Sequence, residues 1–355
     1  MGLEFYKGKK VLITGHTGFK GTWLAKILLD AGAKVSGLSL ESDTVPSLYD
    51  LTGIGKNIDE SIFDIRDYGA TLSIVRSRKP DIVFHLAAQP IVRISYDEPV
   101  RTFQTNVMGT VNILDAVRRT DSVRSVVNVT TDKVYLNEDK DIAFTEDMPL
   151  DGYDPYSNSK SCSELVTHSY SKSFFGGRQV SISTARAGNV IGGGDFSKDR
   201  IIPDCVRAAL NREEIIVRNP SSIRPFQHVL EPLFAYLLIA EKQFGHKELE
   251  GAYNVGPEIS DCISAGEITK LFVQSWGQGL TRIDRSDGGP HEASFLRLDC
   301  TKIKETLGWK CVWDIKKAVE ETVNWTKVYA AGGDVVAEME REIQEFIRDR
   351  GEEDV

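Results

Sequence analysis

The stretch VLITGHTGFKG, residues 11–21, sets an apolar run before three glycines at a G-x-x-G-x-x-G spacing. Glycine permits a tight turn and lets backbone N–H groups approach a pyrophosphate, whose charge the following helix N-terminus stabilises. A glycine triplet alone is a weak signal, because any strand–turn–helix unit can use one. Here the apolar run precedes it and an amphipathic segment follows, which is the context that predicts a dinucleotide-binding turn.

Short apolar runs alternate with longer amphipathic segments through the first half of the chain. We expect strands at 10–14, 34–40, 81–87, 124–130, 179–186 and, later, within 251–257. We expect helices at 21–31, 67–78, 100–119, 154–174 and, at the end of the chain, 335–349. Alternation at this spacing is typical of βαβ units, so it predicts an α/β fold with a doubly wound parallel sheet. Ligands of such sheets bind beyond the carboxyl ends of the strands.

The rhythm breaks after about residue 190. The segments GGGD (192–195) and NPSSIRP (219–225) are rich in turn residues. We therefore expect a Rossmann-type domain at 1–188 and a smaller, discontinuous substrate lobe, mainly at 189–355. Returns to the sheet are expected around 225–257.

Composition excludes several classes of function. The 355-residue chain carries a formal net charge of −9, which argues against nucleic-acid binding, since counterion release needs clustered Lys and Arg. Apolar runs fall short of the roughly 18–20 residues that span a membrane, and the N-terminus lacks a cleavable signal layout. Five scattered cysteines without a CxxC pair predict free thiols in a reducing cytoplasm.

Tyr156 and Lys160 should share one face of the helix expected at 154–174, because residues four apart are neighbours on a helix. A tyrosine with an unperturbed pKa of about 10 is a poor base at neutral pH. A nearby ammonium and a positively charged nicotinamide would lower that pKa by stabilising phenolate. We therefore expect Tyr156 to take a hydroxyl proton while the carbon below it delivers hydride to NAD.

The dinucleotide would lie along the strand ends. No Arg stands after the second strand to take a 2′-phosphate, so NAD is favoured over NADP; Glu41 and Asp43 are the acids nearest the ribose position. The carboxylate of Asp64 could accept from the adenine amine. The predicted cofactor-binding residues are Gly15, Thr17, Gly18, Phe19, Lys20, Gly21, Asp64, Ile65, Leu86, Ala87, Ala88, Gln89, Thr130, Tyr156 and Lys160.

The combination of T-G-x-x-G-x-x-G with a later Y-x-x-x-K resembles the extended short-chain dehydrogenase/reductase family. Within it, TTDKVY (130–135) is similar to the sugar-nucleotide 4,6-dehydratases, whose usual motif is Thr-Asp-Glu. Lys in place of that Glu resembles the CDP-glucose branch. Longer stretches point the same way, namely GHTGFKGTWL (15–24), AAQPIVRISYDEP (87–99), SIRPFQHVLEPL (222–233) and PHEASFLRLDC (290–300). VYLNED (134–139) departs from the Cys-Tyr that is usual in that branch.

This resemblance implies that NAD oxidises a nucleotide sugar at C4, that water leaves across C5–C6, and that the hydride returns to C6. The C4 ketone acidifies the C5 proton. Asp132 would protonate the leaving O6 hydroxyl as a neutral acid, and Lys133 would remove the C5 proton as a neutral amine. Thr131 would hydrogen-bond to O4. The alternative for Asp132-Lys133 is a solvated surface turn.

Arginine can grip a diphosphate bidentately, which makes Arg200 and Arg224 the first candidates for the substrate. Either could instead pair with a surface carboxylate. Asn189 after a strand end, Arg93 and His291 are further candidates. The chemistry needs no metal.

The resemblance also implies a cytoplasmic homodimer, formed by a four-helix bundle of the helices at 100–119 and 154–174, and a place in deoxysugar biosynthesis such as that of lipopolysaccharide O-antigen. Three alternatives stay open. One is a dehydratase of a GDP-, dTDP- or UDP-linked sugar, and another is an NAD-dependent 4-epimerase, which would not need Asp132-Lys133. The third is a catalytically silent dinucleotide sensor.

Overall fold

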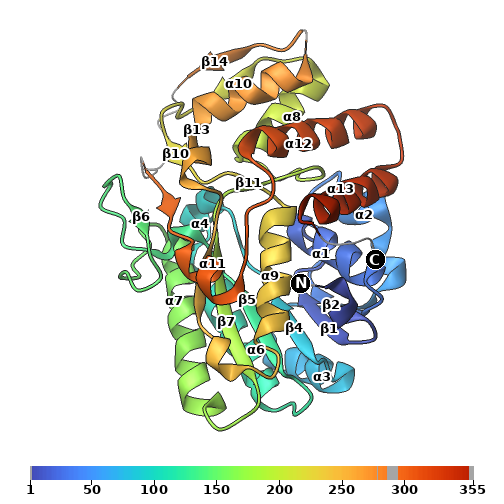
Figure 1. The fold of residues 1–355 in the computed structure, drawn as a ribbon, viewed down its shortest axis with the longest axis vertical. Helices are drawn as coiled ribbons and strands as arrows, with labels where there is room; N and C mark the ends of the chain where they lie inside the picture. The colour runs from blue at the N-terminus through green and yellow to red at the C-terminus, as the bar shows by residue number, and fades with distance from the viewer. Residues whose placement is uncertain (1, 278, 286–294, 352–355) are drawn as a thin grey trace.

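The computed structural model describes residues 2–277, 279–285 and 295–351, and its centre is a seven-stranded sheet (Figure 1). The strand order is β3-β2-β1-β4-β5-β7-β12, with every neighbouring pair parallel. The strands are β1 Lys10–Thr14, β2 Lys34–Ser39, β3 Asp59–Ile62, β4 Ile82–His85, β5 Ser125–Val129, β7 Ser181–Ala187 and β12 Ala252–Val255. Because the order reverses beside β1, the predicted doubly wound parallel sheet is confirmed.

Helices cover both faces of the sheet. On one face lie α3 (Tyr68–Arg78), α6 (Gly109–Arg118) and α7 (Pro155–Tyr170); on the other lie α1 (Phe19–Asp30) and α9 (Leu230–Lys242). Successive residues of a strand point to opposite faces. In β5 Val126 accordingly joins the core under α6, whereas Val127 and Val129 join the core under α9. Burial on both faces explains why these strands read as continuous apolar runs.

The predicted elements are present, with ends displaced by a few residues. Strand β3 is the one strand of this sheet that the sequence analysis missed, and the helices α8 to α12, within residues 201–330, were not placed by it either. The sequence of β3, DESI, is mostly exposed at the sheet edge, so it carries no apolar signal. The helix expected at 100–119 is divided into α5 (Pro99–Phe103), a π-helical turn at Gln104–Met108 and α6. The helix expected at 154–174 likewise ends in a π-helical turn, at Ser171–Phe175.

A second group of helices stands at one end of the sheet, at the top of Figure 1. Its core contains apolar residues of α8 (Ile201–Asn211), α10 (Ala265–Trp276) and α12 (Ile315–Ala330). Short strands join it, namely β9 Ile215–Val217, β10 Ile223–Arg224, β13 Ile263–Ser264 and β14 Arg282–Asp284. The remaining short strands are β6 Ala143–Phe144, β8 Val190–Ile191, β11 Gln227–His228 and β15 Arg297–Leu298.

The last helix, α13 (Val335–Asp349), has the bounds expected from the sequence. Its apolar face packs into the core that α1 and α9 share, where the Phe346 ring lies 4.9 Å from that of Phe234. The other helices are α2 Leu48–Thr52, α4 Val92–Asp97 and α11 Thr301–Leu307. Within the described part of the chain, no helix combines the length and apolar character needed to cross a membrane.

Candidate functional site

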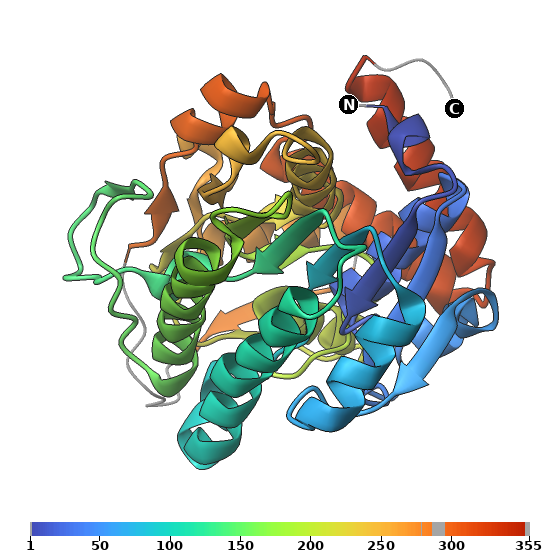
Figure 2. The same cartoon turned by 90° about the horizontal axis from the view of Figure 1, so that it is seen from below.

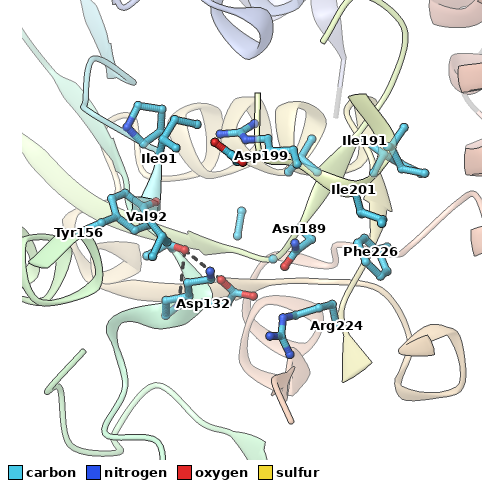
Figure 3. A pocket seen from close by; sticks show the side chains of 18 of the residues that line it. Ile91, Val92, Asp132, Tyr156, Asn189, Ile191, Asp199, Ile201, Arg224 and Phe226 are labelled. Carbon is cyan, nitrogen blue, oxygen red and sulfur yellow. Dashed lines mark hydrogen bonds between the residues drawn. The ribbon is translucent and has the colours of Figure 1, made fainter. Parts of the chain in front are cut away.

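A cavity of about 630 Å³ lies where the carboxyl ends of β4, β5 and β7 face α8 and the loops around β9 and β10. In Figure 3 Tyr156 and Asp132 lie at one end of it, and Ile201 and Phe226 at the other. This volume is in the range of small-molecule sites. Predicted site residues that line it are Lys20, Leu86, Ala88, Arg93, Thr130, Thr131, Asp132, Lys133, Tyr156, Lys160, Asn189, Arg200 and Arg224.

The glycine turn between β1 and α1 has the shape that a dinucleotide needs. Gly15 has a φ of +78°, and a Cβ there would lie 2.8 Å from the Ala87 nitrogen. A Cβ on Gly21 would collide with the Gly15 carbonyl, so the helix can approach the turn only with glycine at that position. Gly18 is exposed, and its Cβ position has ordinary contacts. The turn therefore presents bare backbone at the helix N-terminus, which fits a pyrophosphate.

Thr131, Asp132 and Lys133 leave β5 in a 3₁₀ turn. The Thr131 hydroxyl accepts from the Lys133 backbone N–H and donates to Asp132 Oδ1 at 2.9 Å. Asp132 is 2% exposed, and burial raises the pKa of its carboxyl. Its second oxygen has no hydrogen-bond partner within the described residues. Asp132 is thus a buried carboxyl group whose raised pKa favours the protonated form. The role of general acid that the sequence predicts for it needs that form.

Tyr156 and Lys160 lie on the first turns of α7, whose N-terminus is capped by the Asp154 side chain with Pro155 at the first helical position. The Lys160 ammonium donates to the Val129 carbonyl at 3.0 Å, and burial lowers its pKa to about 8. Burial raises the pKa of Tyr156 to about 12, against a hydrogen bond to Thr131 and the charge of Arg200, which lower it. Burial of the phenol was not foreseen from the sequence, whereas the lowering expected from Lys160 together with a bound nicotinamide stays a prediction.

Lys20, on the first turn of α1, belongs to the same wall as Lys160 and Arg200. Burial and the charges of those two cations lower its pKa to about 7. Three cationic groups therefore gather beside the cavity. This explains how a chain with a net negative charge can offer an anionic ligand a locally positive site.

The predicted arginines approach the cavity from different elements. Arg200 precedes α8 and contacts Asp195 at 3.2 Å, and the buried Arg224 of β10 donates to the Ile223 carbonyl. Arg93, on α4, lies 3.8 Å from Asp199. Asn189 follows β7 and points into the cavity beside Arg224 (Figure 3). His291, which the sequence analysis also proposed, lies outside the described residues.

Several predicted cofactor residues lie away from this cavity. Gln89 is buried, and its side chain donates to Thr102 and accepts from the Ile91 backbone, so it shapes the loop after β4; its contact with the cofactor stays a prediction. Asp64 follows β3 and is held by Arg66, which lowers the pKa of its carboxyl. Gly15, Thr17, Gly18, Phe19, Gly21, Ile65 and Ala87 belong to the turn and to the strand ends at β1, β3 and β4.

Sequence reasoning missed Arg218 and Asp199, which both line the cavity. Arg218 follows β9 and donates to Asp199 at 2.9 Å and to Asp204 at 2.7 Å. Asp199 has a φ of 59°, a left-handed conformation that is uncommon outside glycine. A basic residue directly after a short apolar strand was the available signal, but the β9 strand is too short to read from periodicity.

Residues 12–322 match the family model described as GDP-mannose 4,6 dehydratase. A CDP-glucose 4,6-dehydratase of Salmonella typhimurium is 43% identical over 351 residues, which cover 97% of this chain and 98% of that protein. A probable dTDP-glucose 4,6-dehydratase of Sinorhizobium fredii is 29% identical, covering 89% of this chain and 92% of that protein.

Among solved structures, the UDP-glucuronic acid 4-epimerase of Bacillus cereus, in complex with UDP-glucuronic acid and NAD, superposes with a TM-score of 0.78. It is 21% identical and covers 90% of this chain and 99% of its own, which shows a shared fold. The family model spans most of the chain, and the Salmonella relative matches nearly all of it. The protein therefore belongs to the GDP-mannose 4,6-dehydratase family of extended short-chain dehydrogenases/reductases.

Proposed function

We propose that the protein is an NAD-dependent 4,6-dehydratase that converts CDP-D-glucose to CDP-4-keto-6-deoxy-D-glucose. The observation that carries this proposal is the convergence of Asp132 and Lys133 with Tyr156 and Lys160 on one cavity. The 43% identity to a CDP-glucose 4,6-dehydratase over nearly the full length supports CDP-glucose as the substrate.

The residues around the glycine turn fit NAD, with Lys160 and Tyr156 beside the place where its nicotinamide would lie. When bound, NAD supplies the chemistry of accepting a hydride from C4 and giving it back to C6 of the sugar. Tyr156 removes the proton of the C4 hydroxyl, and the Thr131 hydroxyl, which lies beside the phenol, would hydrogen-bond to the same substrate oxygen. Lys160 remains the nearby cation that stabilises the phenolate.

Asp132 and Lys133 carry out the elimination. Burial raises the pKa of the Asp132 carboxyl, which favours its protonated form, and that form would give its proton to the O6 hydroxyl as water leaves. Lys133 is half-buried at the cavity wall and takes the C5 proton that the neighbouring C4 ketone has made acidic. It would give that proton back to C5 when the hydride returns to C6. Adjacent residues in a tight turn can address adjacent carbons, which is the physical reason for their position in the sequence.

The substrate diphosphate lies among the cations of the cavity. Arg200, Arg224 and Arg218 are the groups with fork geometry for bidentate contacts, and Asn189 and Arg93 supply further polar contacts. Arg218 enters this set from the structure, whereas the others were expected from the sequence.

A 4-epimerase is the competing function, since the fold is shared with epimerases. Epimerisation also needs Tyr156 and Lys160, but it eliminates no water. The buried acid at Asp132 favours the dehydratase, because an epimerase has no use for a protonated carboxyl beside its substrate.

The test is incubation of the purified protein with NAD and CDP-, dTDP-, GDP- and UDP-linked sugars. We expect CDP-glucose to yield a product that absorbs ultraviolet light in alkali, as a 4-keto-6-deoxysugar does, and the others to react at least tenfold more slowly, which corresponds to about 1.4 kcal/mol of discrimination. Formation of CDP-galactose without loss of water would establish the epimerase instead.

We also propose that the protein is a cytoplasmic homodimer that supplies deoxysugar biosynthesis, with lipopolysaccharide O-antigen as the expected destination. Support for the dimer comes from α5, the π-helical turn after it and α7, which adjoin each other (Figure 2). They carry exposed apolar side chains. Val100 is 69% exposed, Met108 50% and Leu165 56%. A second copy that packs the same helices against these would cover them in a four-helix bundle.

Replacement of Leu165 with Arg is expected to give a monomer, because a charge at the centre of an apolar helix–helix contact must be desolvated. Sedimentation velocity at micromolar concentration measures the mass. Ile216→Arg on β9 is the matched control, since Ile216 is comparably exposed, at 47%, but lies in the second group of helices. A monomeric wild-type protein would refute the dimer.

A further inference from the structure

Both ends of the segment Thr130–Tyr135 are held by buried hydrogen bonds. At the first residue, the Thr130 hydroxyl donates to Glu164 Oε1 at 2.5 Å. At the last, the Tyr135 hydroxyl accepts from Arg186 Nη1 at 2.8 Å. Thr130 is 4% exposed and Tyr135 is 1% exposed. The residues assigned to the elimination, Asp132 and Lys133, lie between these two points.

The two groups that hold the segment also hold each other. Arg186 Nη2 donates to Glu164 Oε2 at 3.0 Å, and each side chain is only 4% exposed. Glu164 Oε2 also accepts from the Thr184 hydroxyl at 2.7 Å. Glu164 comes from α7 and Arg186 from β7, so the ion pair joins a helix to the sheet below it. We call Glu164 and Arg186 the clamp.

Further contacts fix the Tyr135 end. Its hydroxyl donates to Asn254 Oδ1 at 2.5 Å, and Asn254 in turn donates to the carbonyls of Phe144 and Asp299. The Tyr135 ring stacks on that of Phe144, with 4.9 Å between the ring centroids. The Arg186 guanidinium packs on the Tyr135 ring, 5.0 Å from its centroid. With this many partners, the tyrosine cannot shift without breaking several buried contacts.

The helix that supplies Glu164 also carries the oxidation residues. Tyr156, Lys160 and Glu164 follow one another at intervals of four, so they lie along one side of α7. Lys160 donates to the Val129 carbonyl at 3.0 Å, and Ser161 donates to the Val134 carbonyl at 2.7 Å. Contacts between α7 and the chain from Val129 to Tyr135 therefore set the distance from Tyr156 and Lys160 to Asp132 and Lys133.

We propose that Glu164 and Arg186 are positioning residues that keep Asp132 and Lys133 in register with Tyr156 and Lys160. This inference rests on the proposed dehydratase function. A buried ion pair is a weak source of stability, since desolvation offsets much of its Coulombic attraction. What the clamp contributes is geometry, because the elimination must follow oxidation of the same sugar, and an error of about 1 Å in a reacting group can cost on the order of a hundredfold in rate.

The decisive variant is Tyr135→Phe, which removes one hydroxyl of the segment and keeps the ring stacked on Phe144. Hydrogen–deuterium exchange of peptides that contain 130–135, measured in the free protein, is expected to become faster by about tenfold, because the segment loses buried hydrogen bonds. Tyr253→Phe is the matched control, because Tyr253 is equally buried and its hydroxyl donates to the Leu249 carbonyl at 2.5 Å, away from the segment.

The kinetic readout separates positioning from general damage. In a single turnover with CDP-glucose, the absorbance of reduced nicotinamide rises with oxidation and falls after elimination. In Tyr135→Phe we expect the rise to stay within twofold of the wild type and the fall to slow by about tenfold, for the same lost contact. Arg186→Lys should behave alike, because lysine keeps the charge but cannot hold Glu164 and Tyr135 with one planar fork. Tyr253→Phe should leave both phases unchanged.

The inference is overturned if exchange in 130–135 is unchanged in Tyr135→Phe, or if both kinetic phases slow by the same factor. The exchange experiment needs no substrate. It therefore still tests whether the buried hydrogen bonds restrain residues 130–135 if CDP-glucose does not react. In that case the proposed function fails, and so does the inference that the clamp serves it. Glu164→Gln is a third variant, and should it fail to fold, Tyr135→Phe and Arg186→Lys decide the question.

Discussion

Replacing Lys133 with methionine is expected to stop the elimination of water while the first hydride transfer continues. Methionine preserves the length and apolar stem of lysine but has no group that can take the C5 proton. Loss of a positioned general base lowers a rate by roughly 10²–10⁴-fold. We therefore expect the deoxysugar product to disappear, and reduced cofactor together with the 4-keto hexose to accumulate on the protein.

The measurement is the absorbance of reduced nicotinamide during a single turnover, with mass analysis of the sugar nucleotides after quenching. Lys140→Met is the matched control, because the Lys140 side chain is 64% exposed and pairs with Glu138 beyond the cavity. That control should retain wild-type turnover. If Lys133→Met still forms the deoxysugar at more than a tenth of the wild-type rate, Lys133 is not the base.

Replacing Tyr156 with phenylalanine is expected to abolish both steps. Without the phenolic oxygen nothing takes the C4 hydroxyl proton, so no hydride leaves C4, and no ketone forms to acidify C5. We expect a loss of roughly 10²–10⁴-fold in turnover, without any accumulation of reduced cofactor. Neither Lys133→Met nor Tyr156→Phe should form the deoxysugar product. Reduced cofactor should accumulate in Lys133→Met but not in Tyr156→Phe.

Binding of CDP-glucose and NAD to Tyr156→Phe, measured by calorimetry, should stay close to that of the wild type, since the ring remains in place. Tyr153→Phe is the control for position, because Tyr153 precedes α7 and is 76% exposed. Retention of dehydration by Tyr156→Phe would contradict the assignment of this residue and would favour a binding protein whose Tyr–Lys pair has no chemical role.

The contrast between Tyr156 and Asp132 shows how far a sequence argument reaches. Burial raises the pKa of both groups, to about 12 for Tyr156. For Asp132 this is the direction that its role requires. For Tyr156 it opposes that role, so the phenolate depends on positive charge from Lys160 and from the cofactor when that is bound. Sequence shows which charges are near in the chain, but burial of each group is a property of the packed molecule.

Features that local regularity encodes could be predicted from the sequence. The alternation of apolar strands and amphipathic helices predicted the parallel sheet, and the glycine turn, the YxxxK pair and TTDKVY each lie within a few residues of a strand or helix end. Such features follow from backbone sterics and from a periodicity of about two or 3.6 residues, and both can be read from neighbouring letters.

Contacts between residues far apart in the chain became known from the folded molecule alone. Arg186 reaches Tyr135 across 51 positions, and Tyr135 reaches Asn254 across 119. Arg218, which directly follows a strand of three residues, joins the cavity wall, and Gln89 holds its own loop through the Ile91 backbone. The physical reason is that a side chain's partners depend on how helices and strands pack against one another, and no local periodicity records that packing.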